Sequence, residues 1–134
     1  MKVLLAEDDL QTASLYEQIL TERGHVVILT SNSEECLETY SESLRQVRTG
    51  SDHCLGVQPF DAVILDYKMP DISGLEVAKE ILAINPRQRI IFASAYIKEA
   101  LLESIRKLKT PVAILQKPIS STSLDRHTRR RRSL

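Results

Sequence analysis

The sequence predicts an α/β protein with a doubly wound parallel sheet, and three observations carry that prediction. Short apolar segments of strand length alternate with longer segments of helical periodicity along the 134 residues. Five such strand–helix units follow one another, which is typical of a parallel sheet with helices on both faces. The strand-like segments are almost continuously apolar, as strands buried on both faces are. At this length the chain fits one domain.

The individual elements follow from local pattern. Strands are expected over 2–6, 25–30, 62–66, 89–94 and 110–116, and helices over 10–23, 34–48, 74–84 and 97–108. The first helix should bury a stripe of Leu15, Ile19 and Leu20 and stop at Gly24. A weak final helix is expected after Pro118.

Composition excludes several classes of protein. The 18 basic and 18 acidic residues balance, so no overall field favours nucleic acid or membranes. No apolar stretch approaches the roughly 20 residues that cross a bilayer, and no signal peptide is visible, so a cytoplasmic location without membrane contact is expected. Cys36 and Cys54 form neither a disulfide framework nor a metal quartet.

The charge distribution predicts two parts. Residues 125–134 contain five arginines and one aspartate. We therefore expect a domain over 1–124 and a basic tail over 125–134. The tail is interpreted as a truncated final helix or as residues foreign to the natural chain.

Polar residues stand where four of the predicted strands end. Glu7, Asp8 and Asp9 follow the first strand, Asp66 ends the third, Ser94 ends the fourth, and Lys117 follows the fifth. In open parallel sheets, ligands gather outside the carboxyl ends of the strands, where the strand order reverses. We therefore expect these side chains to converge in space.

Together these residues predict a phosphoryl-accepting site. Clustered carboxylates repel one another unless a divalent cation neutralises them, and oxygen ligands without a Cys/His set favour Mg²⁺, or Mn²⁺, over zinc. With a cation bound, Asp66 can attack phosphorus to give an acyl phosphate. Lys117 can then neutralise one phosphoryl oxygen, and the Ser94 hydroxyl can donate to another.

Four blocks of this sequence resemble the receiver domain of response regulators in two-component signalling. The blocks are LLAEDD at 4–9, VILDYKMPDISG at 63–74, IFASAY at 91–96 and LQKP at 115–118. The resemblance covers about residues 2–119. It implies a flavodoxin-like (βα)5 three-layer sandwich with sheet order 2-1-3-4-5.

The resemblance also implies residue roles. Asp66 would be the phosphoacceptor, and Glu7 and Asp8 the acidic pair of the metal site. Asp8, Asp66 and the backbone carbonyl of Lys68 would ligate Mg²⁺. Ser94 would be the switch hydroxyl, and Lys117 the lysine that precedes a cis peptide to Pro118. Phosphate on Asp66 would draw Ser94 and Lys117 inward and shift a two-state equilibrium that controls partner binding.

By the same resemblance, the chain is expected to be a signalling module rather than an enzyme, one that catalyses its own phosphorylation and slow autodephosphorylation. The donor would be a sensor histidine kinase, a histidine phosphotransfer protein or a small acyl phosphate. The output protein is unknown, and a phosphorylation-dependent homodimer is a further option. No direct contact with nucleic acid is expected, because no recognition element is visible.

The sequence departs from the family at the switch. Ile114 occupies a position where an aromatic residue commonly swings inward, which a β-branched side chain cannot do in the same way. We therefore hypothesise that Tyr96, beyond Ala95, takes part in the output surface. Lys68 and Tyr96 are each two residues past a site residue, where they could hinder attacking water and prolong the phosphorylated state. A solvated lysine and a half-exposed tyrosine are the alternative.

Two other functions remain open at this point. The chain could be the receiver half of a DNA-binding transcriptional regulator. It could also be a phosphohydrolase of the haloacid-dehalogenase type, although such enzymes typically place a second acid where this chain has Lys68. The connection over 48–60 is longer than the family usually needs and is interpreted as a surface loop.

Overall fold

The computed structural model describes residues 1–49, 58–95, 97–108 and 110–117. Its elements are β1 (Lys2–Ala6), α1 (Leu10–Glu22), β2 (Val26–Thr30), α2 (Ser33–Thr49), β3 (Ala62–Asp66), α3 (Gly74–Ile84), β4 (Ile90–Ser94), α4 (Glu99–Arg106) and β5 (Ala113–Gln116). All strand pairs are parallel, in the order β2-β1-β3-β4-β5. The predicted α/β class and sheet order are confirmed. The expected final helix and basic tail lie outside the described residues.

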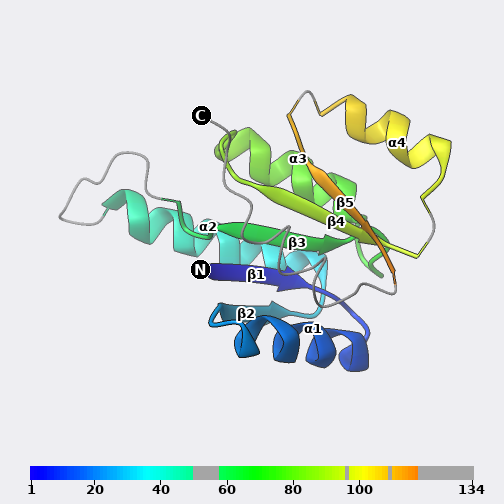
Figure 1. Cartoon of the computed structure of the whole chain (residues 1–134). Coiled ribbons are helices and arrows are strands. Elements are labelled where there is room, and N and C mark those ends of the chain that lie inside the picture. Colours follow the sequence, from blue (N-terminus) through cyan, green and yellow to red (C-terminus); the bar gives the residue numbers. More distant parts are fainter. Residues whose placement is uncertain (50–57, 96, 109, 118–134) are drawn as a thin grey trace.

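Helices cover both faces of the sheet (Figure 1). On one face, Leu4, Val63 and Phe92 of the strands form a core with side chains of α2, α3 and α4. On the other face, Leu5 and Ile64 pack with side chains of α1. Because successive strand residues point to opposite faces, each inner strand contributes to both cores. This explains why the strands are continuously apolar in the sequence.

Helix α1 buries Leu20 and partly buries Ile19, as predicted, but not Leu15. Leu15 is 52% exposed, whereas Ala13, Tyr16 and Leu20 are buried. These three residues have the 3-and-4 spacing of a helix face, and the Tyr16 ring is among its buried side chains. The prediction for Leu15 was wrong because it weighed the aliphatic residues and passed over the tyrosine.

Helix α3 begins in close contact with the end of β3. The Gly74 amide donates to the Tyr67 carbonyl at 2.9 Å, and the Ser73 hydroxyl caps the helix by accepting from the Glu76 amide at 3.3 Å. A Cβ at position 74 would overlap the Asp66 backbone oxygen and lie 3.1 Å from Tyr67 Cα. Glycine therefore lets the β3–α3 loop fold back tightly on the strand that ends in Asp66.

Replacement of this glycine tests the close approach. We expect Gly74→Ala to lower the free energy of unfolding by about 1–3 kcal/mol, because the added methyl must push backbone apart. Urea unfolding followed by circular dichroism measures the effect. Ala83→Ser, on the exposed side of the same helix, is the control and should stay within about 0.5 kcal/mol of wild type. A Gly74→Ala protein as stable as wild type would contradict the contact.

Candidate functional site

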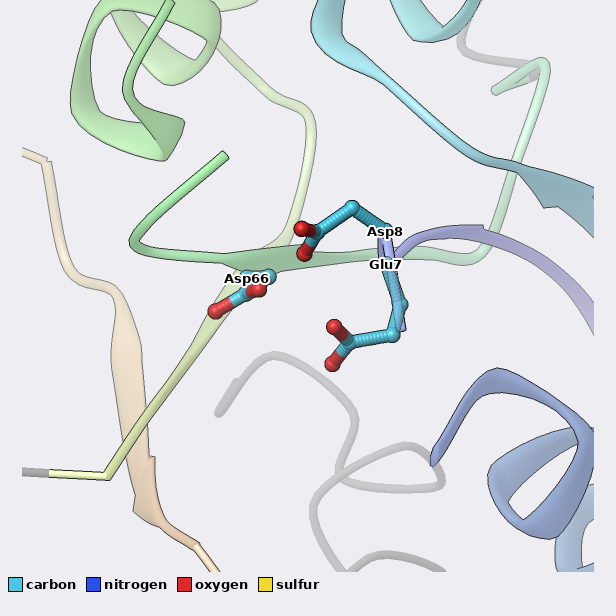
Figure 2. A group of neighbouring side chains, drawn as sticks. All are labelled: Glu7, Asp8 and Asp66. Carbon is cyan, nitrogen blue, oxygen red and sulfur yellow. The ribbon is translucent and has the colours of Figure 1, made fainter. Parts of the chain in front are cut away.

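Three carboxylates meet at the carboxyl ends of two neighbouring strands. Glu7 and Asp8 directly follow β1, and Asp66 is the last residue of β3, whose register places Leu65 opposite Ala6. Figure 2 shows the three side chains gathered at this edge of the sheet. A carboxylate oxygen from each lies within 4.8 Å of those of the other two. The predicted convergence is therefore confirmed for Glu7, Asp8 and Asp66, whereas the Asp9 carboxylate accepts from the Thr12 hydroxyl of α1 and is not part of the group.

The acids differ in their access to water. Glu7 and Asp66 are 2% and 7% exposed, whereas Asp8 is open to solvent. Buried carboxylates need charged or hydrogen-bonding partners, because their desolvation is costly. An exposed third carboxylate leaves the group open on one side, from which an ion or a substrate can approach.

Lys117 joins the two buried acids. Its Nζ lies 2.6 Å from Glu7 Oε1 and 3.2 Å from Asp66 Oδ1. The backbone brings it there because its amide donates to the Ser94 carbonyl at 2.7 Å, just beyond the paired ends of β4 and β5. Strand order thus places an ammonium group from the edge strand between acids from two inner strands.

The single positive charge of Lys117 does not neutralise the three carboxylates. Burial raises the pKa of Asp66 to about 7, with a further increase from the charge of Glu7, and the Lys117 charge offsets only part of it. Burial acts to lower the pKa of Lys117, but its hydrogen bond to Glu7 and the negative charges of Asp66 and Glu7 raise it above the ordinary value. Fully ionised, three carboxylates and one ammonium carry a net charge of −2. An oxygen-only donor set with that charge fits a hard divalent cation.

An open cavity of about 330 Å³ adjoins the cluster. Its lining comprises Asp66, Tyr67, Lys68, Ser94, Ala95, Lys98, Ala100, Leu101 and Lys117. The predicted residues Asp66, Ser94 and Lys117 therefore border one space large enough for a phosphoryl group. Sequence reasoning missed Lys98 and Leu101, because no motif or strand end marks them.

The remaining predicted residues are distributed around the site. Lys68 is exposed, and its amide lies 3.4 Å from Asp66 Oδ1. Ala95 lies exposed at the rim of the cavity. Ile114 is partly buried and packs against the core beneath α2, α3 and α4. Tyr96 and Pro118 lie outside the described residues.

The buried cysteine Cys36 contributes no chemistry to this site. Burial raises the pKa of the Cys36 thiol to about 12, so this cysteine is an unreactive core residue. Cys54 lies in a segment outside the described residues. Among the helices that the structure describes, none is long and apolar enough to cross a membrane.

Comparison with known proteins identifies relatives of this chain. A family model for the response regulator receiver domain matches residues 3–129. The chemotaxis protein CheY of Thermotoga maritima is 29% identical over 107 residues, which cover 78% of this chain and 77% of that protein. The transcriptional regulatory protein ZraR of Escherichia coli (strain K12) is 28% identical over 123 residues, which cover 91% of this chain. The chain spans only 24% of the length of ZraR.

Solved structures show the same fold. The structure of a CheX–CheY complex with BeF3 and Mg²⁺ from Borrelia burgdorferi aligns with a TM-score of 0.77, covering 95% of this chain and 85% of that chain at 23% identity. The family match extends over nearly the whole chain and includes every strand end that carries a predicted site residue. The chain therefore belongs to the family of response regulator receiver domains, the signalling modules of two-component systems.

Proposed function

We propose that Asp66 is the phosphoacceptor of this receiver domain. The observation that carries the proposal is the placement of one buried carboxylate between a partnering ammonium, 3.2 Å away on Lys117, and an open cavity. The donor is a phosphohistidine on a histidine kinase or phosphotransfer protein, or a small acyl phosphate. A phosphoryl group in the cavity lies within reach of Asp66, Ser94 and Lys117 together.

The proposed reaction is an in-line displacement at phosphorus. A carboxylate oxygen of Asp66 forms the new bond as the donor's P–N or P–O bond breaks, and the electron pair leaves with the imidazole or the acyl carboxylate. Lys117 exchanges its contact with Asp66 for a phosphoryl oxygen, and the Ser94 hydroxyl donates to another.

We further propose that Asp8, Asp66 and the Lys68 backbone carbonyl hold Mg²⁺ or Mn²⁺, with Glu7 completing the acidic pair. The bound cation supplies neutralisation of the carboxylates and of the charge that develops on the phosphoryl oxygens. The chain itself then catalyses the transfer by orienting Asp66 and Lys117. It acts as a switch rather than as an enzyme with turnover.

The phosphohistidine protein is proposed to bind the surface beside the acids. Leu10, the first residue of α1, follows the acidic segment directly and is 73% exposed. A phosphohistidine protein that covers the cavity can bury this side chain. For the output, we propose that Ser94 and Lys117 carry the switch without an aromatic rotation, because Ile114 has no ring to move. Tyr96 remains our candidate for the output surface.

The phosphohydrolase alternative is not favoured. A family match over residues 3–129 points to a receiver domain rather than to a phosphohydrolase. A hydrolase would release phosphate repeatedly from a generic phosphate ester, whereas a phosphoacceptor takes up no more than one phosphoryl group per chain. That stoichiometry separates the two in a single assay.

Labelling tests the assignment of Asp66. Acetyl phosphate with Mg²⁺ should add one phosphoryl group to wild type and none to Asp66→Asn, as read by intact-protein mass spectrometry. EDTA should abolish the labelling. Asp61→Asn is a matched control, because Asp61 lies at the other end of the same strand, where it accepts from the Lys2 amide at 2.7 Å. Equal labelling of wild type and Asp66→Asn would refute the assignment.

The raised pKa of Asp66 predicts a pH-dependent stability. The native state binds this proton more tightly than the unfolded state, where the ordinary value is 3.8. The contribution to stability is therefore fully present below about pH 4 and is lost as the pH rises through about 7. In EDTA at pH 8, Asp66→Asn should be more stable than wild type by about 1–3 kcal/mol.

Urea unfolding at two pH values measures this difference. The difference in free energy of unfolding between Asp66→Asn and wild type should become smaller at pH 5, where native Asp66 is largely protonated. Saturating Mg²⁺ at pH 8 should stabilise wild type more than the variant, because the cation binds only the native state. A wild type that is the more stable of the two at pH 8 in EDTA would contradict the charge imbalance.

Lys68 is proposed to prolong the phosphorylated state. Its side chain borders the cavity beside Asp66, where it hinders the approach of water to the phosphoryl group. Phospho-Asp66 should therefore decay several-fold faster in Lys68→Ala than in wild type, as followed by loss of label in the presence of Mg²⁺. Lys79→Ala is the control, since Lys79 is an exposed lysine of α3 that pairs with Glu76. Unchanged decay in Lys68→Ala would end this hypothesis.

A further inference from the structure

The end of β2 and the start of α2 contact the chain beside Glu7 and the loop that follows Asp66. On one side, the Glu7 amide donates to the Thr30 carbonyl at 3.1 Å, and the Thr30 hydroxyl donates to the Leu5 carbonyl at 3.0 Å. On the other side, the first residues of α2 bind the loop that follows Asp66. One short segment therefore joins the end of β1 to the β3–α3 loop.

Asp71 makes the second of these connections. Its Oδ1 accepts from the Ser33 amide at 3.0 Å and its Oδ2 from the Glu34 amide at 2.9 Å. The Ser33 hydroxyl donates to the Ile72 carbonyl at 2.5 Å. The first amides of a helix have no partner within the helix and attract negative charge. Here the Asp71 carboxylate, from a loop distant in the sequence, accepts hydrogen bonds from two of these amides.

The electrostatics agree with this geometry. Desolvation works against ionisation, but the hydrogen bonds from the amides of Glu34 and Ser33 together outweigh it and lower the pKa of Asp71 to about 2. Helix α2 also has a cap of its own, in which Asn32 Oδ1 accepts from the Glu35 amide at 2.8 Å. The carboxylate of Asp71 therefore binds the two amides that precede the one capped by Asn32, and in doing so it ties the β3–α3 loop to the helix.

The loop depends on such external contacts. Residues 67–73 form no helix or strand. Their base is fixed by the Gly74–Tyr67 hydrogen bond at 2.9 Å, and their tip by the contacts of Asp71 and Ile72 with α2. Lys68 lies between these two anchors. Its backbone position is consequently set by both.

We propose that Asp71 is a positioning residue for the cation site. By binding the amino end of α2, it holds the β3–α3 loop so that the Lys68 backbone faces Asp8 and Asp66. This inference rests on the proposed function, in which the Lys68 carbonyl is a cation ligand. Groups that orient metal ligands commonly change metal affinity about 10- to 100-fold when they are removed.

Mg²⁺ titration of the full chain by calorimetry tests the proposal. Asp71→Asn keeps one acceptor oxygen but places an NH₂ group against the second amide, so the affinity for Mg²⁺ should fall about 10-fold, at the lower end of the range for orienting groups. Ser33→Ala keeps the amide contacts with Asp71 but loses the hydroxyl contacts with Ile72 and with Met69 Sδ, and its affinity should lie between those of wild type and Asp71→Asn. Asn32→Ala is the matched control. It removes the local cap of the same helix end without touching the loop, and should leave the affinity within about twofold of wild type, since it orients no ligand.

A second readout separates positioning from mere destabilisation. The initial rate of labelling by acetyl phosphate should require more Mg²⁺ for half-saturation in Asp71→Asn, yet return towards the wild-type rate at saturating Mg²⁺. Partial unfolding would instead lower the fraction of protein labelled at every Mg²⁺ concentration and would overturn the proposal.

The outcomes also distinguish a failure of this inference from a failure of the proposed function on which it rests. A wild type that binds no Mg²⁺ would overturn the proposed function and this inference with it. A wild type that binds Mg²⁺, with Asp71→Asn binding equally well, would overturn the inference alone. An equal loss of affinity in Asn32→Ala and Asp71→Asn would do the same.

Discussion

The ion pairs of Lys117 are the interaction on which the carboxyl edge of this sheet depends. Glu7 is almost completely buried, and its Oε1 lies 2.6 Å from the ammonium group. Without that cation, the protein would bury two neighbouring carboxylates with no compensating charge, which costs several kcal/mol. The ammonium reaches from the edge strand to acids on two inner strands, so the parallel order of the sheet and the charge pattern of the site support each other. The remaining negative charge keeps the cluster suited to a cation.

Much of this arrangement follows from the sequence, because parallel topology places every strand's carboxyl end at one edge. Asp66, Ser94 and Lys117 could be assigned to one site from their positions after apolar runs alone. The connection of Asp71 to Ser33 could not. These residues are 38 positions apart, Ser33 begins a helix while Asp71 lies within a loop, and no periodicity links them. Contacts between irregular segments depend on how the packed layers bring loops together, which local pattern does not encode.

Helix faces show a second limit of sequence reasoning. In α1 the aliphatic Leu15 is exposed, while Tyr16 is buried with Leu20 against the sheet. Aliphatic spacing alone therefore chose a face rotated by one residue. Strand β5 likewise begins at Ala113 rather than at residue 110. Pro111 has no amide hydrogen for the ladder and delays its start. The buried face of α1 and the first residue of β5 both depend on tertiary packing, and neither difference changes the position of a site residue.

The contacts of Lys117 give the proposed switch a route that needs no aromatic rotation. In the resting site, Lys117 is shared between Glu7 and Asp66. A phosphoryl group adds about −1.5 to −2 charge and competes for this one ammonium. If Lys117 turns towards the phosphoryl oxygens, Glu7 loses its partner, and its buried charge then depends on the cation. On the proposed function, phosphorylation and cation binding would therefore be coupled through this one shared side chain, whose backbone amide is anchored to the Ser94 carbonyl at the end of β4.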